Sequence, residues 1–93
     1  MLKIYKYELA CNNGVVQPLR LSTQHKFLSV QLQSGKICLW VLENTDTTIT
    51  TIPIHTFGTG WPIETVVGLE YIGTVQEGRL VWHIFYGTNK EEA

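Results

Sequence analysis

The chain has 93 residues, of which 44% are hydrophobic and 16% charged, and its formal net charge at pH 7 is −1. This length is sufficient for one domain, and the apolar fraction excludes an intrinsically disordered chain. The seven Lys and Arg residues are scattered without a cluster, which disfavours nucleic-acid binding, because that affinity comes from a basic face.

The first predicted strand is Leu2–Leu9, in which apolar and polar residues alternate. The alternation starts at once, so we expect no signal peptide, and no apolar run reaches the about 18 residues of a membrane span. These features predict a cytoplasmic protein without a membrane partner. A shorter strand, Val15–Leu21, contains Pro18, which belongs on a sheet edge because proline donates no ladder hydrogen bond.

Residues 26–42 predict a hairpin that turns at Ser34 and Gly35. Folding the chain there places apolar residues opposite one another on one face: Leu32 with Ile37, Val30 with Leu39, and Leu28 with Val41. The other face pairs Gln33 with Lys36, Gln31 with Cys38, and Ser29 with Trp40. A slip of one residue would mix the two faces, so the pattern specifies this register.

The segment Thr47–Phe57 is rich in Thr and Ile and predicts another strand. Pro53 again points to a sheet edge. The next residues, 58–68, are too rich in glycine for the interior of a strand and predict an irregular loop.

A second hairpin is predicted over residues 69–86, turning at Glu77 and Gly78. This turn pairs Val75 with Leu80 and Tyr71 with Ile84, and it places Gly73 opposite Trp82. A domain at residues 1–87 and a polar tail at residues 88–93 complete the chain. The fold class expected is all-β, or β-dominated α+β: a small antiparallel sandwich or partly open barrel of about six or seven short strands.

Both hairpin faces of residues 69–86 carry apolar side chains, although a strand exposed on one side should alternate with polar residues. The sparse charge also favours self-association, so we expect a homo-oligomer. The residues predicted to form the interface are Ile72, Thr74, Val81, His83 and Phe85, together with Tyr5 and Tyr7 of the first strand.

The loop after Phe57 is a candidate binding site, because Gly58-Thr59-Gly60 could offer backbone N–H groups to an anion. The other interpretation is that the two glycines only permit a sharp turn. The candidate ligand-binding residues are Gly58, Thr59, Gly60, Trp61, His55 and Arg79, with Arg79 arriving from a neighbouring subunit.

No arrangement for catalysis is recognisable in the sequence. General acid–base catalysis by His25, His55 or His83 needs a partner that orients the imidazole, and the sequence shows none. Cys11 and Cys38 are expected to be reduced thiols in the cytoplasm. Their spacing from the histidines matches no zinc pattern, so we expect neither an enzyme nor a metal or other cofactor.

Segments throughout the chain resemble a family of small uncharacterised proteins of bacteriophages and prophages. The similar segments are Ile4–Leu9, Leu28–Gln31, Cys38–Trp40, Phe57–Gly60, Tyr71–Gln76 and Val81–Phe85. Trp61 stands where the resemblance predicts a histidine.

The resemblance implies a non-enzymatic accessory protein in the host cytoplasm that sequesters a host factor or a small anionic, nucleotide-like ligand, for instance to counteract host defence. The alternative is a virion, assembly or protein-interaction module without a small ligand, using edge strands and the tyrosines of Leu2–Leu9.

Overall fold

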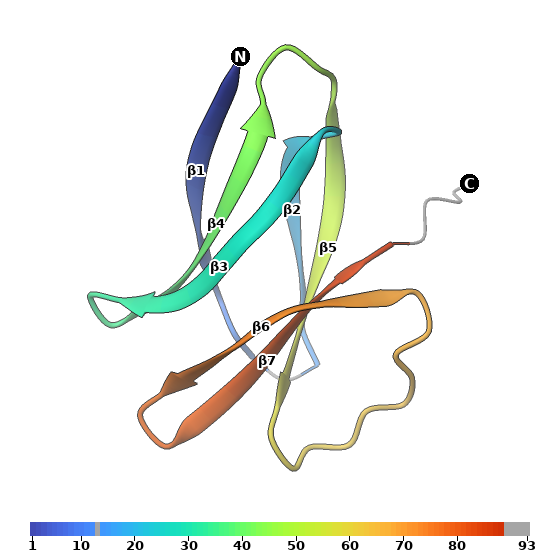
Figure 1. Ribbon diagram of the computed structural model, residues 1–93. Coiled ribbons are helices and arrows are strands. Elements are labelled where there is room, and N and C mark those ends of the chain that lie inside the picture. The colour runs from blue at the N-terminus through green and yellow to red at the C-terminus, as the bar shows by residue number, and fades with distance from the viewer. Residues whose placement is uncertain (13, 89–93) are drawn as a thin grey trace.

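The computed structural model describes residues 1–12 and 14–88, which contain seven β-strands and no helix (Figure 1). The strands are β1 (Leu2–Leu9), β2 (Val16–Ser22), β3 (His25–Gln33), β4 (Lys36–Asn44), β5 (Ile49–Gly58), β6 (Leu69–Glu77) and β7 (Leu80–Gly87). The expected tail lies outside the described residues from residue 89 onward. The all-β prediction is confirmed.

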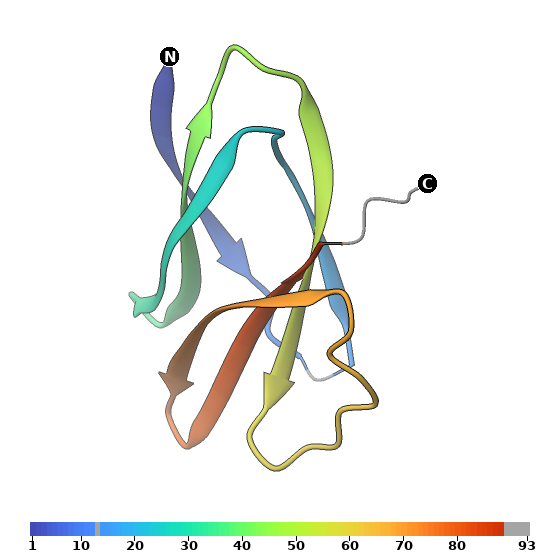
Figure 2. The ribbon, with the colours of Figure 1, turned by 45° about the vertical axis from the view of Figure 1, so that its right-hand side comes forward.

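The strands form two antiparallel sheets that face each other and do not close into a barrel. One sheet has three strands in the order β1-β4-β3, and the other has four in the order β2-β5-β7-β6. Figure 2 shows the β5–β6 loop, residues 59–68, extending from the end of the molecule opposite the N-terminus. The loop lies beside one face of the four-stranded sheet.

The core lies between the sheets and includes inward residues of all seven strands. Its fully buried apolar side chains are Leu21, Leu39, Val41, Ile54 and Ile84. Branched residues such as these suit strands because their side chains pack well on a pleated surface. Removing a side chain of this kind, as in Leu39→Ala, costs about 2–5 kcal/mol of folding stability.

The β3–β4 hairpin has the predicted register over most of its length. Ser34 and Gly35 have φ of 52° and 78°, the left-handed conformation that a type I′ turn requires. The pairing of Leu28 with Val41 is wrong: a bulge between Phe27 and Ser29 makes Phe27 the partner of Val41. A bulge places two residues opposite one, and here Phe27 contacts the core while Leu28 is exposed.

The register predicted for the β6–β7 hairpin is wrong by two residues. Val75 pairs with Trp82 and Glu77 with Leu80, so the turn consists of Gly78 and Arg79. Gly78 has φ of 61°, as the first central residue of a type II′ turn does, and glycine prefers that position. Because the error is an even number of residues, side chains near the turn keep their predicted face.

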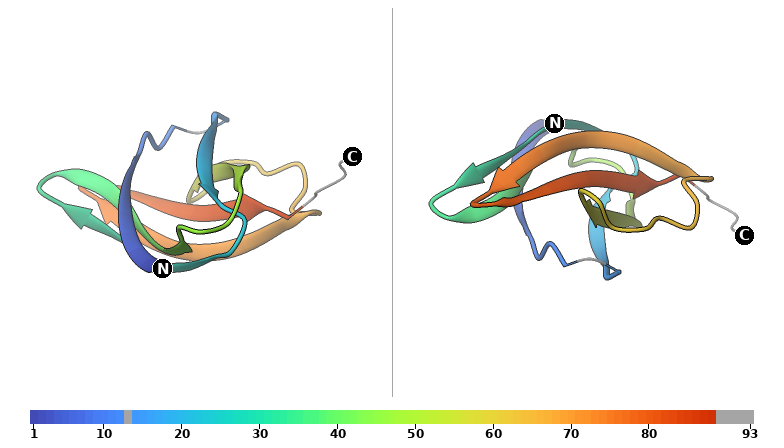
Figure 3. Two further views of the ribbon diagram at one scale, coloured as in Figure 1. Left: turned by 90° about the horizontal axis from the view of Figure 1, so that it is seen from above. Right: turned by 90° about the horizontal axis from the view of Figure 1, so that it is seen from below.

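The two sheets approach each other most closely where β3 runs beside β6, and these strands end on the same side of the molecule (Figure 3). A Cβ on Gly73 would lie 2.8 Å from Val30 Cγ1. Near this contact β6 has a bulge between Tyr71 and Gly73, and the rings of Phe27 and Tyr86 contact each other at a tilt of 42°, with centroids 4.6 Å apart. The contact covers one edge strand of each sheet, β3 and β6.

The two prolines have different positions. Pro18 lies in edge strand β2, as predicted, whereas Pro53 lies in β5, between β2 and β7. Pro53 pairs with Pro18 of β2, and the ladder between β5 and β7 ends next to it, at the pair of Ile54 with Tyr86. β5 is therefore not an edge strand, and the prediction that Pro53 lies on an edge strand is wrong.

Candidate functional site

The Gly-Thr-Gly segment forms a turn whose hydrogen bonds are internal to the protein. The Thr59 N–H donates to the Val81 carbonyl at 3.1 Å, and the Trp61 N–H donates to the Gly58 carbonyl at 3.2 Å. Gly60 has φ of 88°, which favours glycine. These hydrogen bonds fit the turn interpretation, since two of the N–H groups that an anion would need already have partners.

Trp61 packs its indole against the backbone of Gly58. A Cβ at Gly58 would lie 2.7 Å from Trp61 Cδ1, so a side chain there would displace the indole. The indole nevertheless remains 57% exposed. Gly58 therefore serves the close approach of a ring, and Trp61 offers apolar surface at the end of the sheets.

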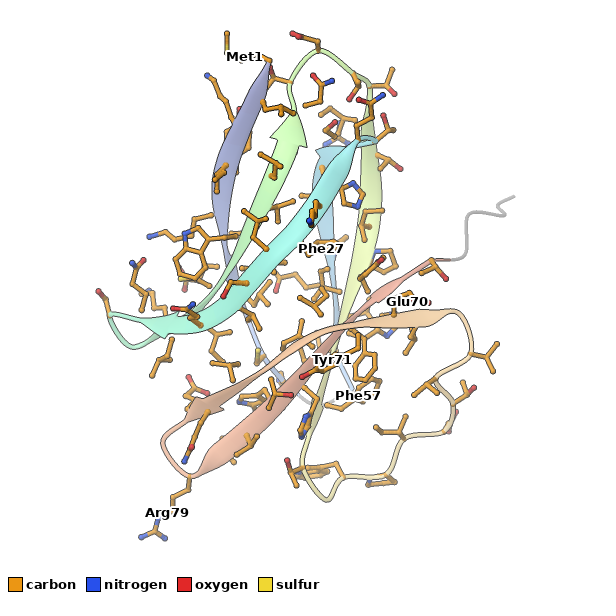
Figure 4. All side chains as sticks on the ribbon, viewed as in Figure 1. Met1, Phe27, Phe57, Glu70, Tyr71 and Arg79 are labelled. Carbon is orange, nitrogen blue, oxygen red and sulfur yellow. The ribbon has the colours of Figure 1, made fainter. Side chains whose placement is uncertain are left out.

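The structure brings His55 near the loop but not Arg79. Arg79 lies at the tip of the β6–β7 hairpin and points away from Phe57 and the β5–β6 loop (Figure 4). His55 lines a cleft of about 340 Å³ between the outer face of the four-stranded sheet and the loop. The lining residues are Gly14, His55, Phe57, Pro62, Ile63, Glu64, Thr65, Val67 and Leu69. A fixed positive charge is absent among them, so this cleft suits apolar rather than anionic groups.

The outer face of the four-stranded sheet, here called the aromatic face, is defined by the strand registers. It comprises Val16, Pro18, Arg20, Thr51, Pro53, His55, Phe57, Leu69, Tyr71, Thr74, Gln76, Val81, His83, Phe85 and Gly87. Among these positions Arg20 carries the only charged side chain at neutral pH, and it lies on edge strand β2.

Rings lie side by side across the centre of the aromatic face. Phe85 makes edge contacts with Phe57 on β5 and with Tyr71 on β6, at centroid distances of 5.7 Å and 5.5 Å. His55 stacks near Phe57, with centroids 6.4 Å apart. Tyr71 is 57% exposed, so the cluster reaches solvent.

A chain of side-chain hydrogen bonds runs beside the rings. Tyr71 Oη lies 2.6 Å from Thr74 Oγ1, Thr74 Oγ1 lies 3.0 Å from His83 Nδ1, and His83 Nε2 lies 2.6 Å from Thr59 Oγ1. These contacts orient the imidazole between two hydroxyls. The sequence showed no partner for His83, because its partners come from β6 and from the β5–β6 loop.

The predicted interface residues separate into two groups. Thr74, Val81, His83 and Phe85 share the aromatic face, as predicted. Ile72 instead packs against the core beside the β6 bulge. Tyr71 replaces it on the aromatic face, a change that period-two alternation cannot reveal because the bulge interrupts it.

The sequence as a whole matches one family model, that of a domain of unknown function, over residues 1–93. The chain belongs to the DUF7352 family. No curated protein and no solved structure matches the chain. Because DUF7352 is a domain of unknown function, membership of the family assigns no activity to this chain.

The first-strand tyrosines lie on the inner side of the three-stranded sheet. Tyr7 packs against the core, and its hydroxyl donates to Glu43 Oε2 at 2.5 Å. Burial and this carboxylate raise the pKa of Tyr7 well above its ordinary value. Tyr5 is 39% exposed near the start of the strand. Tyr7 therefore contributes to the fold itself.

Glu43 is a buried carboxylate that the sequence analysis did not single out. It is only 4% exposed, and its Oε1 accepts the Ser22 N–H at 2.8 Å while Oε2 accepts from Tyr7. Ser22 belongs to the other sheet, so the carboxylate connects the two sheets. A buried charge needs such partners, and its place in the apolar run of β4 was the available signal.

Two other side chains, those of His55 and Cys11, have shifted pKa values. Burial lowers the pKa of His55 below its ordinary value, which favours the neutral imidazole on the aromatic face. Burial and the nearby Glu77 charge raise the pKa of the Cys11 thiol to about 11. Cys11 and Cys38 are both free cysteines.

A second cleft, of about 280 Å³, opens where β3 passes β6. Its lining residues are His25, Lys26, Phe27, Tyr71, Ile72 and Tyr86. A lysine among aromatic lining residues makes this cleft, unlike the first, suited to an anionic group attached to a planar ring. His25 Nδ1 lies 2.7 Å from the Ser22 carbonyl oxygen.

Within residues 1–12 and 14–88, no group of three or more His, Cys, Asp or Glu side chains is placed to hold a metal ion. The same residues include no helix that is long and apolar enough to cross a membrane.

Proposed function

We propose that this DUF7352 chain is a non-enzymatic binding protein that assembles with copies of itself through the aromatic face. The observation that carries the proposal is the near absence of charge on a sheet face that exposes aromatic rings. Interface centres are depleted of charged residues and enriched in aromatic ones. A face of this composition can meet its own copy without opposing like charges.

The polar groups of the aromatic face also favour its burial. Burying a hydroxyl or an imidazole is costly when it loses its hydrogen bonds to water. Here Tyr71, Thr74, His83 and Thr59 already bond to one another. A partner that covers them removes water without leaving these atoms unpaired.

The outer face of the three-stranded sheet has a different composition. Lys6 and Glu8 of β1 lie on this face, and Lys36 of β4 forms an ion pair with Glu8 at 3.3 Å. Lys6 donates to Gln33 at 2.7 Å. Solvated charges of this kind suit water, so the aromatic face is the stronger candidate for self-association.

The resemblance to phage-encoded accessory proteins supplies the setting of the proposal. In this setting the assembled protein acts in the host cytoplasm by sequestering a host protein. The β5–β6 loop, with exposed Trp61, Ile63, Val66 and Val67, provides further apolar surface for such a partner. Sequestration needs stoichiometric binding and no catalytic step.

The proposal is tested with Val81→Glu, which places a carboxylate on the aromatic face two residues from His83. Gln31→Glu is the matched control, because it changes the net charge equally on the exposed outer side of β3. Size-exclusion chromatography with light scattering should give a smaller mass for Val81→Glu than for Gln31→Glu. A folded Val81→Glu with the control's mass would remove the proposal.

A second candidate function, binding of a small nucleotide-like anion, is favoured by the cleft that contains Lys26. The ammonium group would bind phosphate, and Phe27, Tyr71 and Tyr86 would contact the base. Native mass spectrometry against a nucleotide panel tests it, with Lys26→Ala beside the unmodified chain. Absence of any complex of the unmodified chain, or equal binding by Lys26→Ala, would contradict this candidate.

A further inference from the structure

The two sheets have four edge strands, and three of these edges are protected. The edges of β3 and β6 lie against each other. Edge strand β2 contains Pro18, which has no N–H to offer a further strand. The remaining edge belongs to β1, whose other side pairs with β4.

At the C-terminal end of β1, a side chain occupies the edge of the strand. The Gln17 amide donates to the Glu8 carbonyl at 3.1 Å and accepts from the Ala10 N–H at 2.8 Å. Gln17 thus takes the place of a neighbouring strand. It also shows that the backbone groups of even-numbered residues in β1 point away from β4, because these directions alternate along a strand.

By the same alternation, the N–H and C=O groups of Leu2, Ile4 and Lys6 point away from β4. None of these backbone groups has a hydrogen-bond partner among those found in the described part of the chain. The side chains of Leu2 and Ile4 are 64% and 61% exposed. An open edge that exposes apolar side chains is a template for one more strand.

We propose that this edge pairs with β1 of a second copy, antiparallel and two-fold symmetric about Ile4. In this register Ile4 pairs with Ile4 of the second copy, and Leu2 pairs with Lys6. All three residues with outward backbone groups then gain hydrogen bonds, and the two three-stranded sheets become one continuous sheet.

The pattern of charges supports a second copy as the occupant. In the proposed register, Lys6 lies opposite Leu2 of the second copy, and Lys3 lies opposite its Tyr5. No lysine therefore faces a lysine. Like charges directly opposite one another destabilise a strand pair, and the two-fold register avoids them. The pairing ends before Glu8, where Gln17 occupies the edge.

The proposed β1 contact is independent of the contact proposed at the aromatic face. The aromatic face uses side chains of the four-stranded sheet, whereas the β1 edge uses backbone groups of the three-stranded sheet. Two different two-fold contacts on one chain lead to tetramers when they close and to longer assemblies when they do not. A variant of one contact therefore leaves the other measurable.

The first test is Ile4→Pro, with Ile4→Thr as its matched control. Proline is tolerated where the N–H of an edge strand faces solvent, so the ladder with β4 persists while an outward donor is lost. Circular dichroism verifies the strands. By light scattering we expect a smaller mass for Ile4→Pro than for Ile4→Thr, and equal masses for the two folded variants would overturn the proposal.

The second test measures the register and does not need proline. Residues of a hydrogen-bonded antiparallel pair have Cα atoms about 5.5 Å apart, a distance that a disulfide spans. On oxidation, Ile4→Cys should form a covalent dimer. Leu2→Cys mixed with Lys6→Cys should form a covalent heterodimer, whereas Lys6→Cys alone should not exceed the unmodified chain.

The same experiment separates the two proposals. Cross-linking of Ile4→Cys in a Val81→Glu background would support the β1 contact even if the aromatic face were not an interface. Failure of both Ile4→Cys and the mixed pair to cross-link above the level of the unmodified chain would overturn the β1 contact, whatever the mass of Val81→Glu.

Discussion

Gly73 of β6 lies so close to Val30 of β3 that a Cβ at Gly73 would be 2.8 Å from Val30 Cγ1. This contact is where the edge of one sheet meets the edge of the other. The Gly73→Ala chain should lose about 1–3 kcal/mol of stability, as overpacked cores do. In a double-mutant cycle with Val30→Ala, followed by urea unfolding, the double variant should be more stable than the two single losses predict. Additive losses would show that the contact does not limit the packing.

Tyr7→Phe tests the buried carboxylate. The hydroxyl of Tyr7 donates to Glu43, and a hydrogen bond to a charged group contributes about 1.5–3 kcal/mol. We expect a loss of that size in chemical unfolding. Tyr5→Phe is the control, because Tyr5 is partly exposed on the same strand, and it should change stability little. Equal losses in the two variants would contradict a specific role for the carboxylate.

Acid should destabilise the fold through His55. Because burial lowers the pKa of His55 in the folded state, the unfolded chain binds the proton more readily below its ordinary pKa of about 6.5. The contribution is thus complete above that pH and is lost as the pH falls through the folded-state pKa. Stability curves of His55→Gln should be flatter than those of the unmodified chain between neutral and mildly acidic pH. His25, His83 and the nearby Glu64 remain in both chains, so parallel curves would exclude His55 as the cause.

The Cys11 thiol should react slowly with alkylating reagents near neutral pH. Its pKa is raised to about 11, and the thiolate is the reactive species. Replacing Glu77 by Gln removes one of the two causes and should increase the alkylation rate of Cys11, measured by mass spectrometry in a Cys38→Ser background. An unchanged rate would mean that burial alone controls the thiol.

The sequence predicted the strands and the β3–β4 hairpin because alternation and the Ser-Gly turn gave one consistent register. It failed where a bulge interrupts the alternation, at Leu28 and at Ile72. The error in the β6–β7 turn has another cause: glycine suits either central position of a tight turn, and only the observed φ at Gly78 shows which one it occupies.

The candidate site was predictable in composition but not in arrangement. Val81, His83 and Phe85 share a face because period two is exact within one strand. Their contacts with Phe57 and Thr59 depend on which strands are neighbours, and alternation carries no information about strand order. The prediction that Arg79 reaches the Gly-Thr-Gly loop from a neighbouring subunit stays a prediction, because its position within one chain does not test it.

The proposed contact between copies at the aromatic face is most directly tested by isotope-filtered nuclear Overhauser spectroscopy on a mixture of labelled and unlabelled chains. Only protons of different copies that lie close together in space give signals in such a sample. The account predicts intermolecular signals from the Val81 and Leu69 methyl groups to the rings of Phe57, Phe85 or Tyr71. Signals confined to Leu2 and Ile4, or no intermolecular signal at high concentration, would contradict self-association through the aromatic face.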